Sequence, residues 1–303
     1  SSIFAVSVGG FAIMDNHLHV LCRLDPDDAN SWSAEEVIRR WIAIYPPANL
    51  AVEDELVLQK WVAQATHDKQ RVEVLRERLT ELGWFMKALK EPLSRLANKQ
   101  DGCQGAFWQA RYKSIAILDE EALLATCAYI DLNPVAAGIA QTPERSDHTS
   151  IRQRVNHAKK KGQLDRLKVA RQGSVAASHA AGNLEQDHWL IPLEDRRGHN
   201  STSSKSNREG MLDTFSLGSY LLLVDYTGRL FRNGKARLNS AVKEVFDRLG
   251  TSCEFWNDRI TRMLSSRSLR GSYFAADGEK VKELAVQRGR RQLPNLSPQL
   301  NAG

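Results

Sequence analysis

Two histidines, two residues apart, are the first feature of this sequence that could do chemistry. His17 and His19 fall in the stretch 17–22, whose alternating pattern predicts a β-strand with both imidazoles on one face. Their Cα atoms would then lie about 6–7 Å apart, so the two rings can close on a single metal ion. The alternative is a pair of histidines on a half-exposed strand, because this short pattern often arises by chance.

A tyrosine and an asparagine, four residues apart, form the second candidate. Residues 129–134 read YIDLNP, and on a continuous helix Tyr129 and Asn133 lie one above the other. The Asn133 amide oxygen is a hard ligand that suits a divalent ion. The Tyr129 phenol, with a free pKa of about 10, reacts only when a cation and a positioned phosphate assist it. The alternative is an asparagine that caps the helix before Pro134, with the tyrosine packed in the core.

Three elements must position these side chains. Alternating apolar residues predict a hairpin over 4–24, which turns at Asp15 and Asn16. A strand is predicted over 107–118, and a helix is predicted to start at Asp119 and to end near Pro134. We expect the hairpin and the 107–118 strand to share one antiparallel sheet, on which this helix packs with Tyr129 facing the histidines.

The remaining sequence predicts further helices. Ser33 and Glu36 form a capping box at the start of one helix, and a second helical stretch carries Val72 to Leu82. A third helix follows Gly83 and is expected to bury an apolar stripe and to expose a basic one. The stripe consists of Phe85, Leu89, Leu93 and Leu96, and the basic residues are Lys87, Lys90, Arg95 and Lys99.

Bulk composition narrows the class of protein. The 303 residues are 42% hydrophobic and 26% charged, which is typical of a globular protein with real cores. A net charge of +6 favours a polyanionic partner. The four cysteines are far apart and show no paired motif, so we expect a reduced, cytoplasmic protein without disulfides or zinc. No apolar run is long enough to cross a bilayer, and no signal peptide opens the sequence.

Basic and aromatic residues predict where DNA would bind. Arg111 and Lys113 would share one face of their strand beside Trp108, a combination that suits the phosphates and bases of a single strand. Lys87, Lys90 and Arg95 on the third helix are weaker candidates for DNA contact. The alternative for both groups is an ordinary solvated surface.

Three ordered motifs together resemble a known family. FAIMDNHLHVLCRL at 11–24, FWQARYKS at 107–114 and YIDLNPVAA at 129–137 resemble, in order and spacing, the REP-associated tyrosine transposases of the HUH superfamily. The resemblance covers about residues 4–142, with looser similarity around 225–229.

The resemblance implies an α+β fold with a ferredoxin-like HUH core. It implies that His17, His19 and Asn133 hold Mg²⁺ or Mn²⁺ and that Tyr129 is the nucleophile. The implied activity is the cutting and rejoining of single-stranded or hairpin DNA through a 5′-phosphotyrosine. Because the phosphodiester is exchanged rather than hydrolysed, no external energy source is needed.

The sequence also departs from that family. The family core begins with a strand and a helix ahead of the hairpin, and this sequence starts near the end of that helix, so we expect the first strand to be missing. The family usually has Arg where Ala136 stands, and residues 48–70 look like an insertion.

Composition divides the chain into three predicted segments. They are a catalytic domain at 1–149, a basic, partly disordered linker at 150–210 and a C-terminal helical module at 211–303. The linker contains Lys159, Lys160 and Lys161, which we expect to aid only non-specific binding. We expect a monomer or a homodimer with no membrane partner. Two other functions stay open: a plasmid replication or mobilisation nuclease, against which the 107–114 and 129–137 motifs argue, and a domesticated DNA-binding protein that does not cleave.

Overall fold

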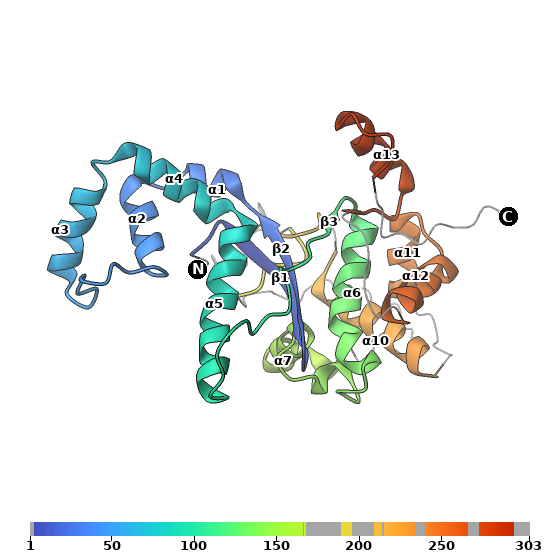
Figure 1. Cartoon of the computed structure of the whole chain (residues 1–303). Helices are drawn as coiled ribbons and strands as arrows, with labels where there is room; N and C mark the ends of the chain where they lie inside the picture. Colours follow the sequence, from blue (N-terminus) through green and yellow to red (C-terminus); the bar gives the residue numbers. More distant parts are fainter. Residues whose placement is uncertain are drawn as a thin grey trace. The chain divides into compact units, whose positions relative to one another are not determined.

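A computed structural model describes residues 3–165, 167, 189–195, 209–213, 215–233, 240–265 and 273–293 (Figure 1). The chain forms a mixed structure of helices and short strands, which agrees with the α+β class. The strands are β1 (Val6–Ile13), β2 (Leu18–Leu24), β3 (Ala116–Ile117) and β4 (Tyr273–Phe274). The helices are α1 (Pro26–Asn30), α2 (Ala34–Ile42), α3 (Glu55–Ala65), α4 (Lys69–Thr80), α5 (Leu82–Gln100), α6 (Glu120–Ala136), η1 (Pro143–Arg145), α7 (Ser150–Lys160), α10 (Leu217–Asn233), α11 (Ser240–Leu249), α12 (Cys253–Ser265) and α13 (Gly278–Gln287).

The chain divides into two compact units. The helical unit comprises Ser1–Ser7 and Cys22–Lys113, and the hairpin unit comprises Val8–Leu21 and Ser114–Gly303. This division differs from the three segments expected from composition, since residues 22–113 form a unit of their own and the C-terminal helices belong with the hairpin.

The helical unit is built around α2 and α4. The Ser33 side chain accepts a hydrogen bond from the Glu36 backbone N–H at 3.1 Å, which confirms the predicted cap of α2. Apolar residues at helical spacing, such as Val72, Leu75 and Leu79, are buried between the two helices. One expectation is wrong: Leu93 and Leu96 on α5 are 43% and 53% exposed, while Phe85 and Leu89 are half-buried, so the apolar stripe of α5 is only partly covered.

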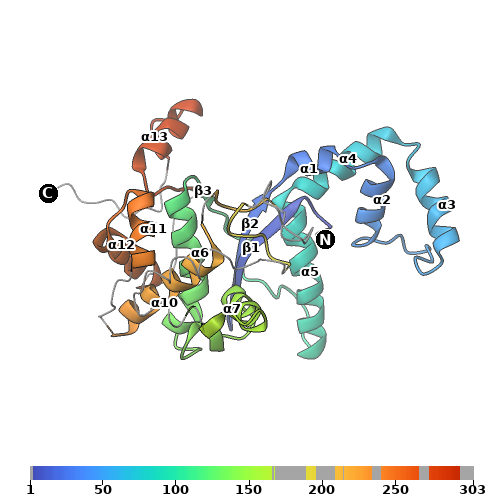
Figure 2. The same cartoon turned by 180° about the vertical axis from the view of Figure 1, so that it is seen from behind.

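The hairpin unit is organised around α6. Ten of its residues are buried, because the sequence from Ala122 to Pro134 is apolar on almost every side. The helix begins where it was predicted, with the Asp119 carboxylate accepting from the Ala122 N–H at 2.7 Å. Helices α10 and α12 pack against it. Seen from behind, α10 slopes across the lower part of α6 (Figure 2).

The hairpin itself matches its prediction. Strands β1 and β2 form a two-stranded antiparallel sheet. The turn lies at Asp15 and Asn16, and the Met14 N–H donates to the His17 carbonyl at 2.8 Å. His17 immediately precedes β2, and His19 is its second residue.

The predicted strand at 107–118 is wrong. Only Ala116 and Ile117 form a strand, and they pair in parallel with Tyr273 and Phe274 rather than with the hairpin. Residues 148–150 already occupy the outer edge of β1, where Ala12 bridges to Thr149 and the Ile13 N–H donates to the His148 carbonyl. The end of β1 beside Ala12 and Ile13 is therefore paired with residues 148–150 rather than with residues 107–118.

The first part of the predicted linker is helical. Helix α7 occupies its first eleven residues and buries Ile151, Arg154 and Ala158. Most of the predicted linker beyond residue 165 lies outside the described residues. The C-terminal helical module expected at 211–303 contains α10, α11, α12 and α13. Throughout the part of the chain that the structure describes, every helix is too short or too polar to span a membrane.

Candidate functional site

The two histidine side chains face each other at the start of β2. Their rings meet edge to face with centroids 4.8 Å apart, and the two Nε2 atoms are 3.1 Å apart. The Nδ1 atom of His17 lies 2.6 Å from the Asn16 amide oxygen. An N–H at Nδ1 donates to that oxygen, so the lone pair of His17 Nε2 accepts a hydrogen bond from the Nε2–H of His19.

Tyr129 lies against this pair. Its ring packs edge to face on His19 with centroids 5.2 Å apart, so the predicted approach of α6 to the histidines is confirmed. Burial raises the pKa of Tyr129, and a hydrogen bond with the Asn133 side chain partly opposes the rise. The phenol is therefore protonated at neutral pH in the free protein. Asn133 follows one helical turn later, as the sequence spacing predicted.

The geometry of the histidine pair fits a divalent ion. Two neighbouring ligands of an octahedral ion, each about 2.1 Å from the metal, are about 3.0 Å apart, close to the separation of the two Nε2 atoms. Burial and the neighbouring His17 lower the pKa of His19 to about 4, so its imidazole is neutral and free to bind a metal. Among the described residues, no group of three or more His, Cys, Asp or Glu could hold an ion. The Asn133 amide, one helical turn from Tyr129, could supply a third ligand of another type.

A buried carboxylate on α6 fixes the orientation of that helix. Asp131 is fully buried and accepts hydrogen bonds from Ser150 Oγ at 2.5 Å, Arg154 Nη1 at 3.0 Å and Tyr220 Oη at 2.5 Å. The Nη2 atom of Arg154 donates to the Gly9 carbonyl. One side chain of α6 is thus tied to β1, α7 and α10.

This network positions the site indirectly. Asp131 lies two residues from both Tyr129 and Asn133, so it projects from a different side of α6. Holding that side fixes the rotation of the helix and hence the direction of the Tyr129 ring. Sequence reasoning missed the network, although one signal was present: an acidic residue within an apolar helix usually has a buried partner.

The predicted DNA contacts lie in the helical unit. The Lys90 ammonium sits 4.6 Å from the centre of the Trp108 ring, and the Trp108 indole N–H donates to the Lys90 carbonyl. Arg95 forms an ion pair with Glu91, which weakens its case as a phosphate ligand. Arg111 and Lys113 are exposed on an irregular segment, so the expectation that they share a strand face is wrong.

No family model, no curated protein and no solved structure matches the chain.

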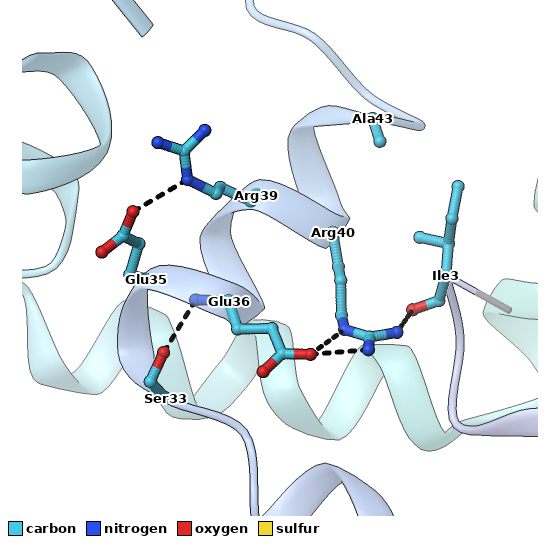
Figure 3. A pocket seen from close by; sticks show the side chains of 7 residues that line it. All are labelled: Ile3, Ser33, Glu35, Glu36, Arg39, Arg40 and Ala43. Atoms are coloured by element: carbon cyan, nitrogen blue, oxygen red, sulfur yellow. Dashed lines mark hydrogen bonds and ion pairs between the residues drawn. The ribbon is translucent and has the colours of Figure 1, made fainter. Parts of the chain in front are cut away.

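A surface hollow on α2 is the other concave feature of note (Figure 3). Ile3, Ser33, Glu35, Glu36, Arg39, Arg40 and Ala43 line it. Arg39 pairs with Glu35, and Arg40 pairs with Glu36 and donates to the Ile3 carbonyl. These charges are satisfied among themselves, so the hollow offers no free group for catalysis.

Proposed function

We propose that this chain is a metal-assisted, single-tyrosine nuclease of the HUH type that cuts and rejoins single-stranded or hairpin DNA, as REP-associated tyrosine transposases do. One observation carries the proposal: the Tyr129 ring lies against a pair of histidines whose Nε2 atoms converge. A helix that presents a tyrosine to a histidine-bearing hairpin is the core of the ferredoxin-like HUH arrangement, which we propose for the hairpin unit.

In the proposed reaction, the Tyr129 hydroxyl oxygen attacks the scissile phosphorus. The phenolic proton leaves to solvent, the bond from phosphorus to O3′ breaks, and the departing O3′ takes up a proton. The products are a 5′-phosphotyrosine and a free 3′-OH. Attack by a new 3′-OH on the phosphotyrosine reverses the step and restores Tyr129. When bound, Mg²⁺ or Mn²⁺ would withdraw charge from the phosphate and favour the phenolate.

Each neighbouring side chain has a task in that scheme. Asn16 accepts from Nδ1 of His17 and so keeps the Nε2 lone pair available as a ligand. His19 is neutral, because its pKa is lowered to about 4. The hydrogen bond from Asn133 holds the Tyr129 oxygen in place before the substrate arrives. Together these contacts orient the side chains, and the reaction also requires an ion and a phosphate.

The test is the trapping of the covalent intermediate. The protein is incubated with Mn²⁺ and labelled hairpin DNA, and an SDS gel is inspected for a protease-sensitive, shifted band. Tyr129→Phe should abolish the band, because it removes the nucleophilic oxygen and keeps the ring. Tyr112→Phe, a change at an exposed tyrosine in the helical unit, is the matched control and should leave the band intact. A band that persists in Tyr129→Phe would show that another residue is the nucleophile.

A DNA-binding protein that does not cleave is the second candidate. The observation that favours it is the burial of Tyr129, which is 5% exposed and whose pKa is raised. If this candidate is correct, the protein binds DNA but never forms the covalent band with any hairpin or metal.

A further inference from the structure

A second cluster of chemistry-bearing side chains lies in the helical unit, on α2, α4 and α5. Three aromatic rings gather there: Trp41, Tyr45 and Trp84. Their centroids are 4.8 Å apart for Trp41 and Tyr45, 5.3 Å for Trp41 and Trp84, and 6.0 Å for Tyr45 and Trp84. All three rings are half-buried, so the group lies at the surface of the unit.

Two cations rest on these rings. The Arg78 guanidinium lies 4.7 Å from the centre of the Trp84 ring and 5.6 Å from that of Trp41. The Lys87 ammonium lies 4.7 Å from the centre of Trp84 and 5.8 Å from that of Tyr45. Within the described residues, no carboxylate forms an ion pair with either cation, in contrast to Arg95 on the same face of α5.

Cations held in this way are prepared to bind an anion. Stacking on an indole uses the face of a guanidinium and leaves its in-plane N–H donors free, and an ammonium beside a ring keeps donors that face away from it. The rings also restrict both long side chains before a ligand arrives, which lowers the entropy lost on binding.

Tyr45 contributes its ring to the cluster. Its hydroxyl is buried and has no hydrogen-bond partner among the described residues. Burial and the nearby Glu91 raise the pKa of Tyr45, so the hydroxyl remains protonated. Glu91 is the acidic group facing this cluster, and its charge is offset by the ion pair with Arg95.

The same arrangement repeats along α5, which points to a polymeric anion. Lys90 follows Lys87 by one helical turn and rests on Trp108 at 4.6 Å. Residues 76–113 carry eight Lys or Arg against four Asp or Glu. A single phosphate would need one such site, whereas a chain of phosphates can use cations in succession.

We propose that Arg78 and Lys87, arranged on the Trp84, Trp41 and Tyr45 rings, bind the phosphodiester backbone of single-stranded DNA. The choice of DNA rests on the proposed function, whereas the anion-binding chemistry rests on the helical unit alone. Interleaved rings and cations favour a single strand, whose unpaired bases can stack on aromatic surface beside the bound phosphates.

The test compares two charge-matched double variants in the Tyr129→Phe background without metal, so that no cleavage interferes. Arg78→Gln with Lys87→Gln removes the two proposed contacts. Arg71→Gln with Lys60→Gln removes the same charge from exposed sites on α4 and α3 and is the control. Affinity for a labelled single-stranded oligonucleotide is measured by fluorescence anisotropy across a salt series.

Losing two phosphate contacts should lower the salt slope by about 1.4 and weaken binding roughly 25-fold at 0.1 M salt. The control should retain nearly all of its affinity. Equal losses in both double variants, or none in the first, would overturn the proposal, and so would equal weakening for single-stranded and duplex DNA. Lys87→Gln alone, at an exposed position, should weaken binding roughly fivefold. This change keeps the test decisive if the double variant unfolds.

The outcome is independent of the covalent-band assay. If the Arg78 and Lys87 variant binds DNA more weakly but the protein never forms the covalent band, the proposed DNA-binding surface is supported and the proposed nuclease activity is refuted. If the protein forms the covalent band but its DNA affinity does not depend on Arg78 and Lys87, the proposed surface is refuted and the proposed nuclease activity is supported.

Discussion

Arg154→Met tests whether the buried network holds α6. Both side chains of the Asp131–Arg154 pair are 0% exposed, so removing the guanidinium leaves a buried carboxylate without its cation. Asp131 keeps Ser150 and Tyr220 as donors, while the Gly9 carbonyl loses the donor that Arg154 supplies. Breaking a buried pair from one side costs about 3–5 kcal/mol. That is a large part of the roughly 5–15 kcal/mol that stabilises a typical domain.

Urea unfolding, followed by circular dichroism, measures this loss. The matched control is Arg229→Met, which breaks the ion pair with Asp225 between half-exposed side chains on α10. An exposed pair of this i,i+4 type contributes about 0.3–0.5 kcal/mol. A midpoint for Arg154→Met that equals the midpoint of the control would refute the reasoning, since a buried pair cannot be removed from one side at no cost.

Three further predictions concern the histidine pair. In EDTA, the lowered pKa of His19 should reduce the free energy of unfolding by roughly 3 kcal/mol as pH falls from 6.5 toward 4. Above pH 6.5, His19 should cause no loss of stability. His19→Gln should flatten the pH profile of unfolding below this value, whereas His67→Gln at an exposed site should not; identical profiles would contradict this. Mn²⁺ at a hundred times its dissociation constant should stabilise the protein by about 2.7 kcal/mol, and an equal rise in the melting temperature of His17→Ala would show that the ion binds elsewhere. Asn16→Ala should weaken Mn²⁺ binding about 10–100-fold in calorimetry, and unchanged affinity would remove Asn16 from the site.

Local signals in the sequence predicted the parts of the site that depend on nearby residues. The turn at Asp15 and Asn16 and the cap at Asp119 are each set by a few adjacent side chains. The four-residue spacing of Tyr129 and Asn133 fixes their relation on any helix. These features needed no knowledge of the rest of the chain.

Features that depend on distant partners were not predictable in the same way. The 107–118 stretch has a plausible strand pattern, but a strand also needs a free edge, and residues 148–150 occupy that of β1. The Asp131–Arg154 pair joins residues 23 apart, and Tyr220 lies 89 residues from Asp131. Helix α7 could have been recognised from Ile151, Arg154 and Ala158, whose spacing is helical, although basic residues at its end suggested a linker.

The enclosure of α6 also has a consequence for how the protein is made. Arg259 on α12 pairs with Glu121 on α6 across 138 residues of chain, and α10 and α12 cover the apolar side chains of α6. While the ribosome is still adding those helices, the apolar side chains of α6 that they cover are exposed to water, and Asp131 lacks the Tyr220 donor. A nascent chain carrying the histidine hairpin and the tyrosine therefore has an incompletely packed α6. On the proposed function, the fully packed site forms only once translation has passed α12.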